Sequence, residues 1–325
     1  MRLISASEIE AAIDFAPFVE RLRDAFRAGC EVPLRHHHEI APHNATLLLM
    51  PAWRTQRLLG VKMVTVFPGN AAHGLPSVMG VYVLASASTG LPLAVLDGRM
   101  LTLKRTAAAS ALAATFLARS SSARLLMVGT GALAPHLVLA HASVRQIREV
   151  TVWGRTPEKA ERLARDISGR GLHARATSDL EGAARRADII CCATLARDPL
   201  IRGEWLAPGQ HLDLVGGFTP EMREADDGVI ERARLFVDTR DGALKEAGDI
   251  VQPLRAGLIT ERKIVADLAQ LCRASRAGRG GEQEITLFKS VGTALEDLAA
   301  AEFVYERTQP PAPALQAPGP QAPGP

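Results

Sequence analysis

The sequence predicts a two-domain α/β protein, with an N-terminal α+β domain followed by a doubly wound parallel sheet. Three observations predict this fold. An apolar run at 124–128 leads directly into the glycine turn Gly129-Thr-Gly131-Ala-Leu-Ala134. Strand patterns and helix patterns alternate from that run onward, which is typical of parallel sheets with right-handed crossovers. More than a hundred residues precede the turn, which is enough for a separate domain.

Length and composition are those of a globular protein. The chain has 325 residues, of which 47% are apolar, so two buried cores are expected. A net charge of +3 is too small to predict nucleic-acid binding. Charges or glycines interrupt every apolar stretch, and residues 1–8 lack a signal-peptide pattern, so we expect no membrane segment and no secretion. The four cysteines show neither disulfide nor metal-ligand spacing, which favours a reducing cytoplasm.

The N-terminal part predicts helices followed by strands. Ser5 and Glu8 have the spacing of a capping box, and Phe18, Leu22 and Phe26 recur on one helix face. Apolar runs separated by turn signals then predict strands. The expected strands are 47–50, 58–67, 78–85 and 91–96, and an alanine-rich helix over 101–118 follows them.

From residue 124 the pattern predicts the strands of the parallel sheet. They are 125–128, 150–153, 173–176, 189–193, 212–215 and 235–237. Helices are expected between most of them, such as 157–167 with proline in its first turn. A further strand pattern at 285–290 precedes the last helix, 292–305. The tail 308–325 is proline-rich and repeats Gln-Ala-Pro-Gly-Pro, so we expect it to be disordered.

The glycine turn has the form that seats the pyrophosphate of a dinucleotide on a helix N-terminus in a Rossmann-type domain. Gly129 permits a tight turn, Gly131 lets the backbone approach the phosphates, and Ala134 keeps the helix close to the sheet. A purely structural turn is the alternative, but the strand before and the helix after it favour a dinucleotide. Further cofactor contacts are expected from Ala132, Leu133, Ala193, Thr194 and Val215.

The residues after the second strand of this domain favour NADP(H), with NAD(H) as the alternative. An NAD site typically has a carboxylate there, which accepts a hydrogen bond from the ribose 2′-hydroxyl. No acid occurs at 150–157; Arg155, Thr156 and Lys159 follow the strand instead. A guanidinium binds a 2′-phosphate through paired, charge-assisted hydrogen bonds. The alternative role for Arg155 is that of a solvated loop charge.

Several further stretches carry a family resemblance. They are Val32-Pro-Leu-Arg35, Leu59-Gly-Val-Lys62, His73-Gly-Leu-Pro-Ser77, and the segments 101–110, 128–132, 285–292 and 295–298. In this order they resemble the ornithine cyclodeaminase/mu-crystallin family. The resemblance implies NAD(P)-linked chemistry on small cyclic imino acids or amino acids. It also implies a homodimer, and a substrate-binding and dimerisation domain formed by 1–118 with 293–307, beside a cofactor domain at 119–292.

Three cations stand among apolar or small residues: Arg35, Lys62 and Arg105. A buried cation without a partner is costly, so each either forms an internal ion pair or binds an anionic ligand. The resemblance implies substrate contacts for these three and for Ser77, and cofactor contacts for Arg105 and Thr106. Lys62 and Arg105 are the expected catalytic residues, with Lys62 supplying the proton that converts an imine to an iminium.

One position departs from part of the family. The glycine pair after the fifth predicted strand is followed by Phe218, where ornithine cyclodeaminases have an aspartate and archaeal alanine dehydrogenases an acid. A phenyl ring cannot accept a proton, although a cation–π contact remains open to it. This favours reduction of an existing C=N bond over attack on ornithine. The segment 218–224 resembles the bacterial pyrroline-2-carboxylate reductase branch.

The predicted activity is therefore NADPH-dependent reduction of Δ1-pyrroline-2-carboxylate or Δ1-piperideine-2-carboxylate to proline or pipecolate. The alternatives are an ornithine cyclodeaminase or amino-acid dehydrogenase, and a binding protein that retains NADPH, as mu-crystallin does. For His36-His37-His38 we expect a polar strand or loop and no metal, because adjacent side chains of a strand point to opposite faces. The acids of 238–249 also match the family, and we expect structural pairing for them.

Overall fold

The computed structural model describes residues 1–42, 45–76 and 78–309, and the proline-rich tail beyond them lies outside the described residues. The N-terminal domain contains a six-stranded sheet in the order β1-β6-β5-β4-β3-β2. Its strands are β1 (Arg2–Ile4), β2 (His36–Ile40), β3 (Ala45–Trp53), β4 (Leu58–Val66), β5 (Val78–Ser86) and β6 (Pro92–Asp97). Strands β2 to β6 are antiparallel to their neighbours, and β1 pairs in parallel with β6.

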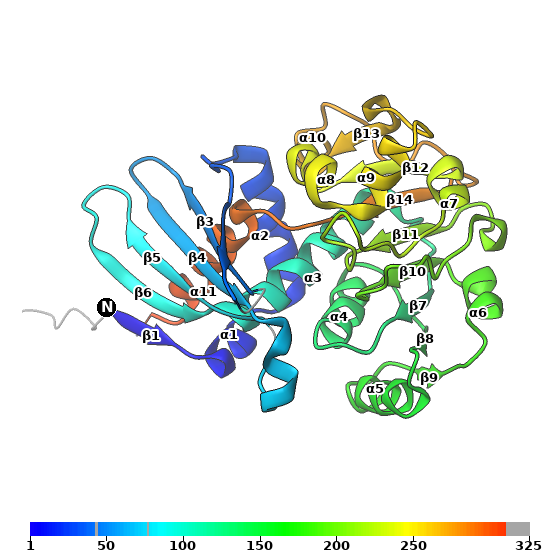
Figure 1. Ribbon diagram of the computed structural model, residues 1–325, viewed down its shortest axis with the longest axis horizontal. Helices are drawn as coiled ribbons and strands as arrows, with labels where there is room; N and C mark the ends of the chain where they lie inside the picture. The colour runs from blue at the N-terminus through cyan, green and yellow to red at the C-terminus, as the bar shows by residue number, and fades with distance from the viewer. Residues whose placement is uncertain (43–44, 77, 310–325) are drawn as a thin grey trace, which may run out of the picture.

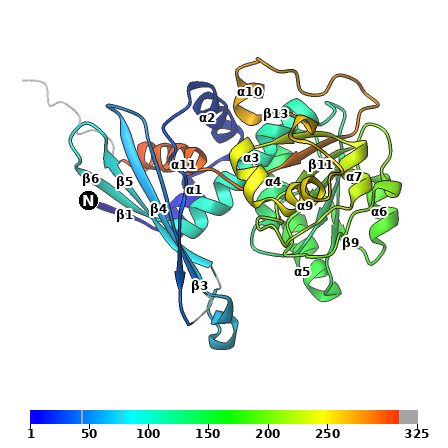
Figure 2. The ribbon, with the colours of Figure 1, turned by 45° about the horizontal axis from the view of Figure 1, so that its top comes forward.

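One face of this sheet is covered by helices. They are α1 (Ala6–Ala12), α2 (Phe15–Ala28), α3 (Gly98–Leu117) and α11 (Ala294–Arg307), with a short 3-10 helix η1 (Pro68–His73) between β4 and β5. The predicted capping box at α1 is confirmed, because the Ser5 hydroxyl accepts from the Glu8 N–H while the Glu8 carboxylate accepts from the Ser5 N–H. The last helix, α11, returns from the far end of the chain to pack on this sheet (Figures 1 and 2).

The opposite face of the sheet is apolar and exposed. Its side chains alternate with those that face the helices, as the pleat of a strand requires. The exposed ones include Leu3, Met63, Met79 and Val83. Strand register places them on one face, because Val83 is opposite Val95, which also pairs with Leu3. Contiguous apolar surface of this kind is typical of a protein–protein interface.

The second domain is a parallel eight-stranded sheet in the order β13-β12-β14-β11-β10-β7-β8-β9. Its strands are β7 (Arg124–Val128), β8 (Glu149–Trp153), β9 (Ala174–Ala176), β10 (Ile189–Cys192), β11 (His211–Leu214), β12 (Arg234–Val237), β13 (Ile264–Asp267) and β14 (Thr286–Lys289). The six predicted strands are all present, the further strand pattern at 285–290 is β14, and the structure adds β13. Strand β14 inserts between β11 and β12, so the last strand in the chain lies inside the sheet.

Both faces of this sheet are buried, as expected for a doubly wound fold. The helices are α4 (Ala134–Val144), α5 (Pro157–Gly169), α6 (Leu180–Arg186), α7 (Asp227–Arg232), α8 (Arg240–Glu246), α9 (Gly248–Arg255) and α10 (Leu268–Cys272), with the 3-10 helices η2 (Gly203–Trp205) and η3 (Glu261–Lys263). Along β7, Leu125 and Met127 belong to one core cluster and Leu126 and Val128 to the other. The predicted Rossmann-type sheet is confirmed.

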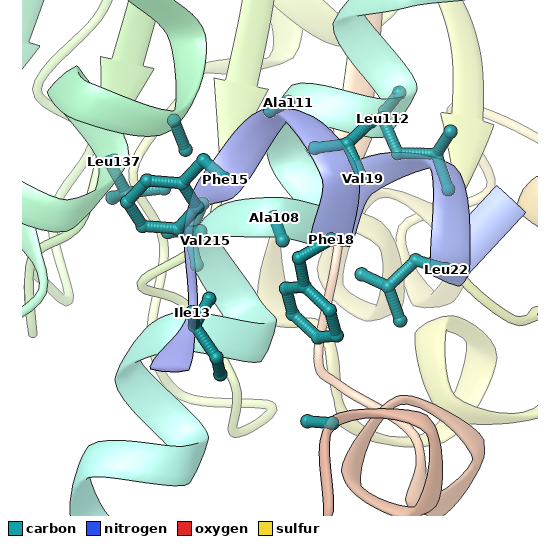
Figure 3. Close-up of a cluster of buried hydrophobic side chains, with 14 of the residues drawn as sticks. Ile13, Phe15, Phe18, Val19, Leu22, Ala108, Ala111, Leu112, Leu137 and Val215 are labelled. Atoms are coloured by element: carbon teal, nitrogen blue, oxygen red, sulfur yellow. The ribbon is translucent and has the colours of Figure 1, made fainter. Parts of the chain in front are cut away.

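The two domains share part of a core. Helix α3 lies between them in the ribbon (Figure 1), and it packs against α2 on one side and α4 on the other. Phe15 and Phe18 of α2 meet Ala108 of α3, and Leu137 of α4 and Val215 after β11 belong to the same cluster (Figure 3). The alanines of α3 permit this close approach of three helices. No helix within the described residues has both the length and the apolarity to cross a membrane.

Two helices begin at other residues than predicted, and in both cases the N-cap residue explains the difference. Helix α3 begins at Gly98 rather than at residue 101, because the Asp97 carboxylate accepts from the Met100 N–H. Helix α11 begins at Ala294 rather than at residue 292, since Thr293 is its N-cap. Gly292 before it has a φ of +83°, a left-handed conformation that favours glycine.

Candidate functional site

The glycine turn connects β7 to α4 at the carboxyl edge of the parallel sheet. Gly129 has a φ of +116°, and a Cβ there would lie 2.6 Å from the Ala193 carbonyl oxygen. A Cβ on Gly131 would meet no heavy atom within 4 Å. The fold itself therefore requires glycine at 129, whereas Gly131 leaves an open space in front of the N-terminus of α4. This cradle fits the pyrophosphate of a dinucleotide.

The end of β8 lies beside that turn. The Gly129 N–H donates to the Trp153 carbonyl at 2.9 Å, and a Cβ on Gly154 would lie 2.7 Å from the Thr130 methyl group. The next residues, Arg155, Thr156 and Lys159, are exposed. Within the part of the chain that the structure describes, Arg155 and Lys159 form no ion pair. Both charges are thus exposed on the segment that follows the end of β8.

The other predicted cofactor residues surround the same edge with different exposure. Ala132 is exposed, while Leu133, Ala193 and Thr194 are half-buried. Thr106 is also half-buried, on α3. The Val215 side chain differs, because it packs into the core between the domains and is 7% exposed (Figure 3). The Val215 side chain is thus part of the core, and the expected cofactor contact of Val215 stays a prediction.

Lys62 and Arg105 meet two acids of α11 in a buried cluster. The Lys62 Nζ lies 2.8 Å from Asp297 Oδ2, and the Arg105 Nε lies 2.9 Å from Asp297 Oδ1. The Arg105 Nη1 lies 2.6 Å from Glu296 Oε2. All four side chains are almost wholly buried. Asp297 therefore joins the two predicted catalytic cations.

Three elements of the fold, β4, α3 and α11, position the side chains of this cluster. Lys62 is on the helix-covered face of β4, at the same alternation as the buried Gly60 and Val64. Arg105 comes from α3, and both acids stand in the first turn of α11. Acidic side chains in the first turn are stabilised by the helix macrodipole. The cluster thus forms where the returning helix crosses the sheet.

Burial and neighbouring charge shift the pKa values of this cluster. Burial lowers the pKa of Lys62 to about 8, although the Asp297 carboxylate opposes that shift. Burial also raises the pKa of Glu296 to about 7, and Arg105 opposes it. For Asp297 burial acts in the same direction, but the nearby Arg105 and Lys62 charges outweigh it and lower its pKa. An amine whose pKa lies near neutrality suits proton transfer.

Arg35 lies on the other side of Gly292 from Arg105. Its Nη2 donates to the Gly292 carbonyl at 3.0 Å, and its Nη1 lies 3.0 Å from Glu246 Oε2. A Cβ on Gly292 would lie 2.3 Å from the Arg105 Nη1. The Asp238 carboxylate accepts from the Gly292 N–H at 2.6 Å. Gly292 is thus the point where the two guanidinium groups come together.

A cavity of about 340 Å³ opens at Arg35, and its lining includes Asp238, Glu246 and Gly292. Asp238 follows β12 and Gly292 comes shortly after β14, so the cavity lies at the carboxyl edge of the parallel sheet. Ligands of open α/β sheets bind at this edge. The volume is that of a small-molecule site.

The comparisons with known proteins agree with this geometry. The model of the ornithine cyclodeaminase/mu-crystallin family matches residues 2–310. This protein belongs to that family. It is 38% identical over 314 residues to a Δ1-pyrroline-2-carboxylate reductase of Colwellia psychrerythraea, and the match covers 94% of this chain and 99% of the relative. The resemblance inferred from the motifs is confirmed.

Two solved structures of similar proteins contain a nicotinamide nucleotide. A Δ1-pyrroline-2-carboxylate reductase of Thermococcus litoralis in complex with NADH and L-proline has a TM-score of 0.90 and 36% identity, covering 94% of this chain and 97% of its own. An archaeal alanine dehydrogenase dimer with bound NAD has a TM-score of 0.88 and 30% identity, covering 94% of this chain and 95% of its own. The cradle at Gly131 fits the cofactor that these relatives bind.

Sequence reasoning missed the acidic half of this family site. For Arg35, Lys62 and Arg105, internal ion pairing was the alternative to ligand binding, and the structure shows such pairs for all three. No role was foreseen for Glu296 or Asp297, although two adjacent acids inside the apolar run 294–304 were a usable signal. Ser77 lies outside the described residues.

Other candidate residues lie apart from the cluster. His36 and His38 are exposed on β2, with ring centroids 6.4 Å apart. Phe218 is 41% exposed on the loop after β11. A separate buried polar group lies between the sheet and α3 and α4: Asp213 accepts from Ser110 and Cys191 and pairs with His141, each at 3.1 Å. These contacts satisfy a carboxylate inside the core.

Proposed function

We propose that this protein is an NADPH-dependent reductase of cyclic ketimine carboxylates, which converts Δ1-pyrroline-2-carboxylate or Δ1-piperideine-2-carboxylate to L-proline or L-pipecolate. The observation that carries the proposal is the cationic cluster of Arg35, Lys62 and Arg105 at the carboxyl edge of a Rossmann-type sheet. A relative in the same family, from Thermococcus litoralis, binds NADH and L-proline.

In this proposal Arg35 holds the substrate carboxylate. Its guanidinium lines the cavity and is paired with Glu246. The substrate carboxylate would take the place of the Glu246 carboxylate in this pair. A planar guanidinium binds a carboxylate through two parallel hydrogen bonds. Arg105 stays paired with Glu296 and Asp297, and so holds Asp297 beside Lys62.

Lys62 supplies the proton of the reaction. As the ammonium form it protonates the imine nitrogen, and the resulting iminium carbon is far more electrophilic than that of a neutral imine. Asp297 orients the ammonium group through its contact at 2.8 Å. The nicotinamide, when bound at the glycine turn, supplies the hydride to the same carbon. A lysine pKa of about 8 allows the proton to leave and return at neutral pH.

Phe218 supports reduction over deamination. A deaminase needs an acid or base that serves the substrate amine, and the residue after Gly217 is here a phenyl ring. Release of ammonia from L-ornithine in the presence of NAD would favour the cyclodeaminase alternative. Stoichiometric binding of NADPH without turnover of any imine would favour a binding protein instead.

The cofactor preference rests on the charges beside the glycine turn. Arg155 and Lys159 are exposed and form no ion pair among the described residues, so both are free to meet a 2′-phosphate. The proposed partner is a second copy of this chain, docked on the exposed face that carries Leu3, Met63 and Val83. A similar alanine dehydrogenase is described as a dimer. The free cysteines suit a cytoplasmic location.

The test is an assay of NADPH and NADH oxidation with the two cyclic imines, and with pyruvate plus methylamine as an acyclic imine. We expect NADPH oxidation with at least one cyclic imine. Lys62→Met keeps the length of the side chain but removes the proton, so kcat should fall by roughly 10²–10⁴-fold while NADPH still binds. Turnover of Lys62→Met at the wild-type rate would refute the role of Lys62.

A further inference from the structure

One buried carboxylate joins two loops at the carboxyl edge of the parallel sheet. The Glu224 Oε1 accepts from the Thr194 N–H at 2.7 Å and from the Thr194 hydroxyl at 2.8 Å. Its Oε2 accepts from the Gly216 N–H at 2.7 Å. Thr194 follows β10 and Gly216 follows β11, so Glu224 couples the ends of two neighbouring strands. Its side chain is fully buried.

A second buried acid, Asp249, binds the backbone of Glu224, and Lys289 pairs with that acid. The Asp249 Oδ1 accepts from the Glu224 N–H at 2.8 Å and from the Ala225 N–H at 3.0 Å. The Asp249 Oδ2 lies 3.2 Å from the Lys289 Nζ. Both residues are fully buried. Lys289 ends β14, so the strand that the fold inserts into the middle of the sheet carries the cation of this unit.

The glycine pair of the second loop lies close to these acids and to the Thr194 backbone, since a Cβ on Gly216 would lie 2.1 Å from the Thr194 carbonyl oxygen. A Cβ on Gly216 would lie 2.4 Å from Glu224 Oε1, and a Cβ on Gly217 would lie 2.7 Å from Asp249 Oδ2. Any larger residue at either position would push the loop away from the carboxylates. The close approach therefore fixes the backbone of this loop immediately before Phe218.

Each coupled loop continues with a large apolar side chain that the protein leaves exposed. Leu195 follows Thr194 and is 67% exposed, and Phe218 follows Gly217 and is 41% exposed. Strand β10 also pairs with β7, whose end forms the glycine turn. The two side chains consequently follow β10 and β11, the first and second strands from β7 in the sheet, at the edge where nicotinamide rings bind in such sheets.

We propose that Glu224, backed by Asp249 and Lys289, is a positioning residue that holds Leu195 and Phe218 as the apolar walls of the nicotinamide subsite. This inference rests on the proposed function only in requiring that a nicotinamide nucleotide binds. The walls exclude water from the ring and from the imine carbon that receives the hydride, and small-molecule sites are largely apolar for this reason. Glu224 acts through the two loops and does not itself touch the cofactor.

The test variant is Glu224→Gln in the full-length protein. The amide keeps the size of the side chain, but only its oxygen can accept a hydrogen bond. Its NH2 group therefore faces either the Thr194 N–H or the Gly216 N–H, and that bond is lost. In the cofactor-free protein we expect hydrogen exchange of the Thr194 and Gly216 amides to become roughly 10–100-fold faster. The dissociation constant for NADPH, measured by its fluorescence, should rise by at least about tenfold.

Glu302→Gln is the matched control. Glu302 is also a buried acid, but its partners are Arg54 and Arg57 of the N-terminal domain. This variant should leave both loops and the NADPH affinity unchanged. Thr194→Val gives a second route if Glu224→Gln does not fold, because it leaves the Glu224 carboxylate in place and removes the hydroxyl bond to it, together with the longer bond from the Ala196 N–H at 3.3 Å. Leu195→Ala should weaken NADPH binding without faster exchange in the loops.

Unchanged exchange, or faster exchange with an unchanged NADPH affinity, would overturn the inference. A purely structural role would lower thermal stability without the selective effect on the cofactor. The proposed function fails separately: a wild-type protein that binds NADPH but reduces no imine would refute the reductase and leave the role of Glu224 intact.

Discussion

Replacing Asp297 by asparagine should move the pH dependence of the reaction. Asp297 is the carboxylate that touches both Lys62 and Arg105, at 2.8 and 2.9 Å. Asparagine has the same shape but no charge. Without the negative charge, burial and the Arg105 guanidinium both disfavour the ammonium form of Lys62, since both already lower its pKa in the native protein. The pKa of Lys62 should therefore fall further.

The size of the expected shift in the pKa of Lys62 follows from its contact with Asp297. At an effective dielectric constant of about 20, unit charges separated by 2.8 Å attract by about 6 kcal/mol. Breaking a buried ion pair costs about 3–5 kcal/mol in practice. At about 1.4 kcal/mol for each pKa unit, this is a shift of about 2–4 units. From its native value of about 8, the pKa of Lys62 should fall to roughly 4–6.

The assay is kcat/KM for the imine as a function of pH. A proton donor is active only when protonated, so the rate declines as the pH rises through the pKa of Lys62. In Asp297→Asn the decline should begin about 2–4 units earlier, and the loss relative to wild type should be roughly 100-fold at neutral pH and small under acidic conditions. Glu302→Gln, on the same helix, should keep the native profile. A profile for Asp297→Asn that coincides with that of wild type would refute the coupling.

Three further predictions concern the cofactor, the substrate and the dimer. Arg155→Ala should lower kcat/KM for NADPH by at least about tenfold and leave that for NADH within about twofold, with Arg162→Ala as control; equal losses would contradict a 2′-phosphate contact. Glu246→Gln should lower KM for the imine severalfold, because it removes the carboxylate that competes for Arg35, and a raised KM would speak against that competition. Met63→Asp should convert the proposed dimer to a monomer in light scattering, and a monomeric wild-type protein would remove the basis of that proposal.

Local patterns were sufficient to predict the cofactor half of the site. The strand, the glycine turn and the start of the next helix are contiguous, and the positive φ of Gly129 is what short-range rules predict for a tight turn. The register of the larger sheet was not predictable in the same way. Strand β14 joins β11 and β12 only because Thr286 pairs with both His211 and Arg234. No rule about neighbouring residues specifies such a distant partner.

The substrate-binding half of the site could be predicted only in part, for the same reason. The cations at 35, 62 and 105 were recognisable because each stands in an apolar or small-residue context. Their partners were not, since Asp297 lies 235 positions from Lys62 in the chain. Similarly, Glu224 was part of a recognised motif, but its function depends on Thr194 and Gly216 meeting at one edge. Pairing of this kind is a property of the folded chain.

The charges of the site also determine which cation can receive a substrate. Lys62 and Arg105 share Asp297 in full burial, so displacing that acid would leave a carboxylate without compensation inside the protein. The pair of Arg35 and Glu246 differs, because both side chains are about one-fifth exposed and line the cavity. Burial raises the pKa of Glu246 although Arg35 opposes it. In the proposed reaction an anionic substrate therefore exchanges with Glu246 at Arg35, while the inner network stays fixed and keeps the Lys62 ammonium oriented for proton transfer.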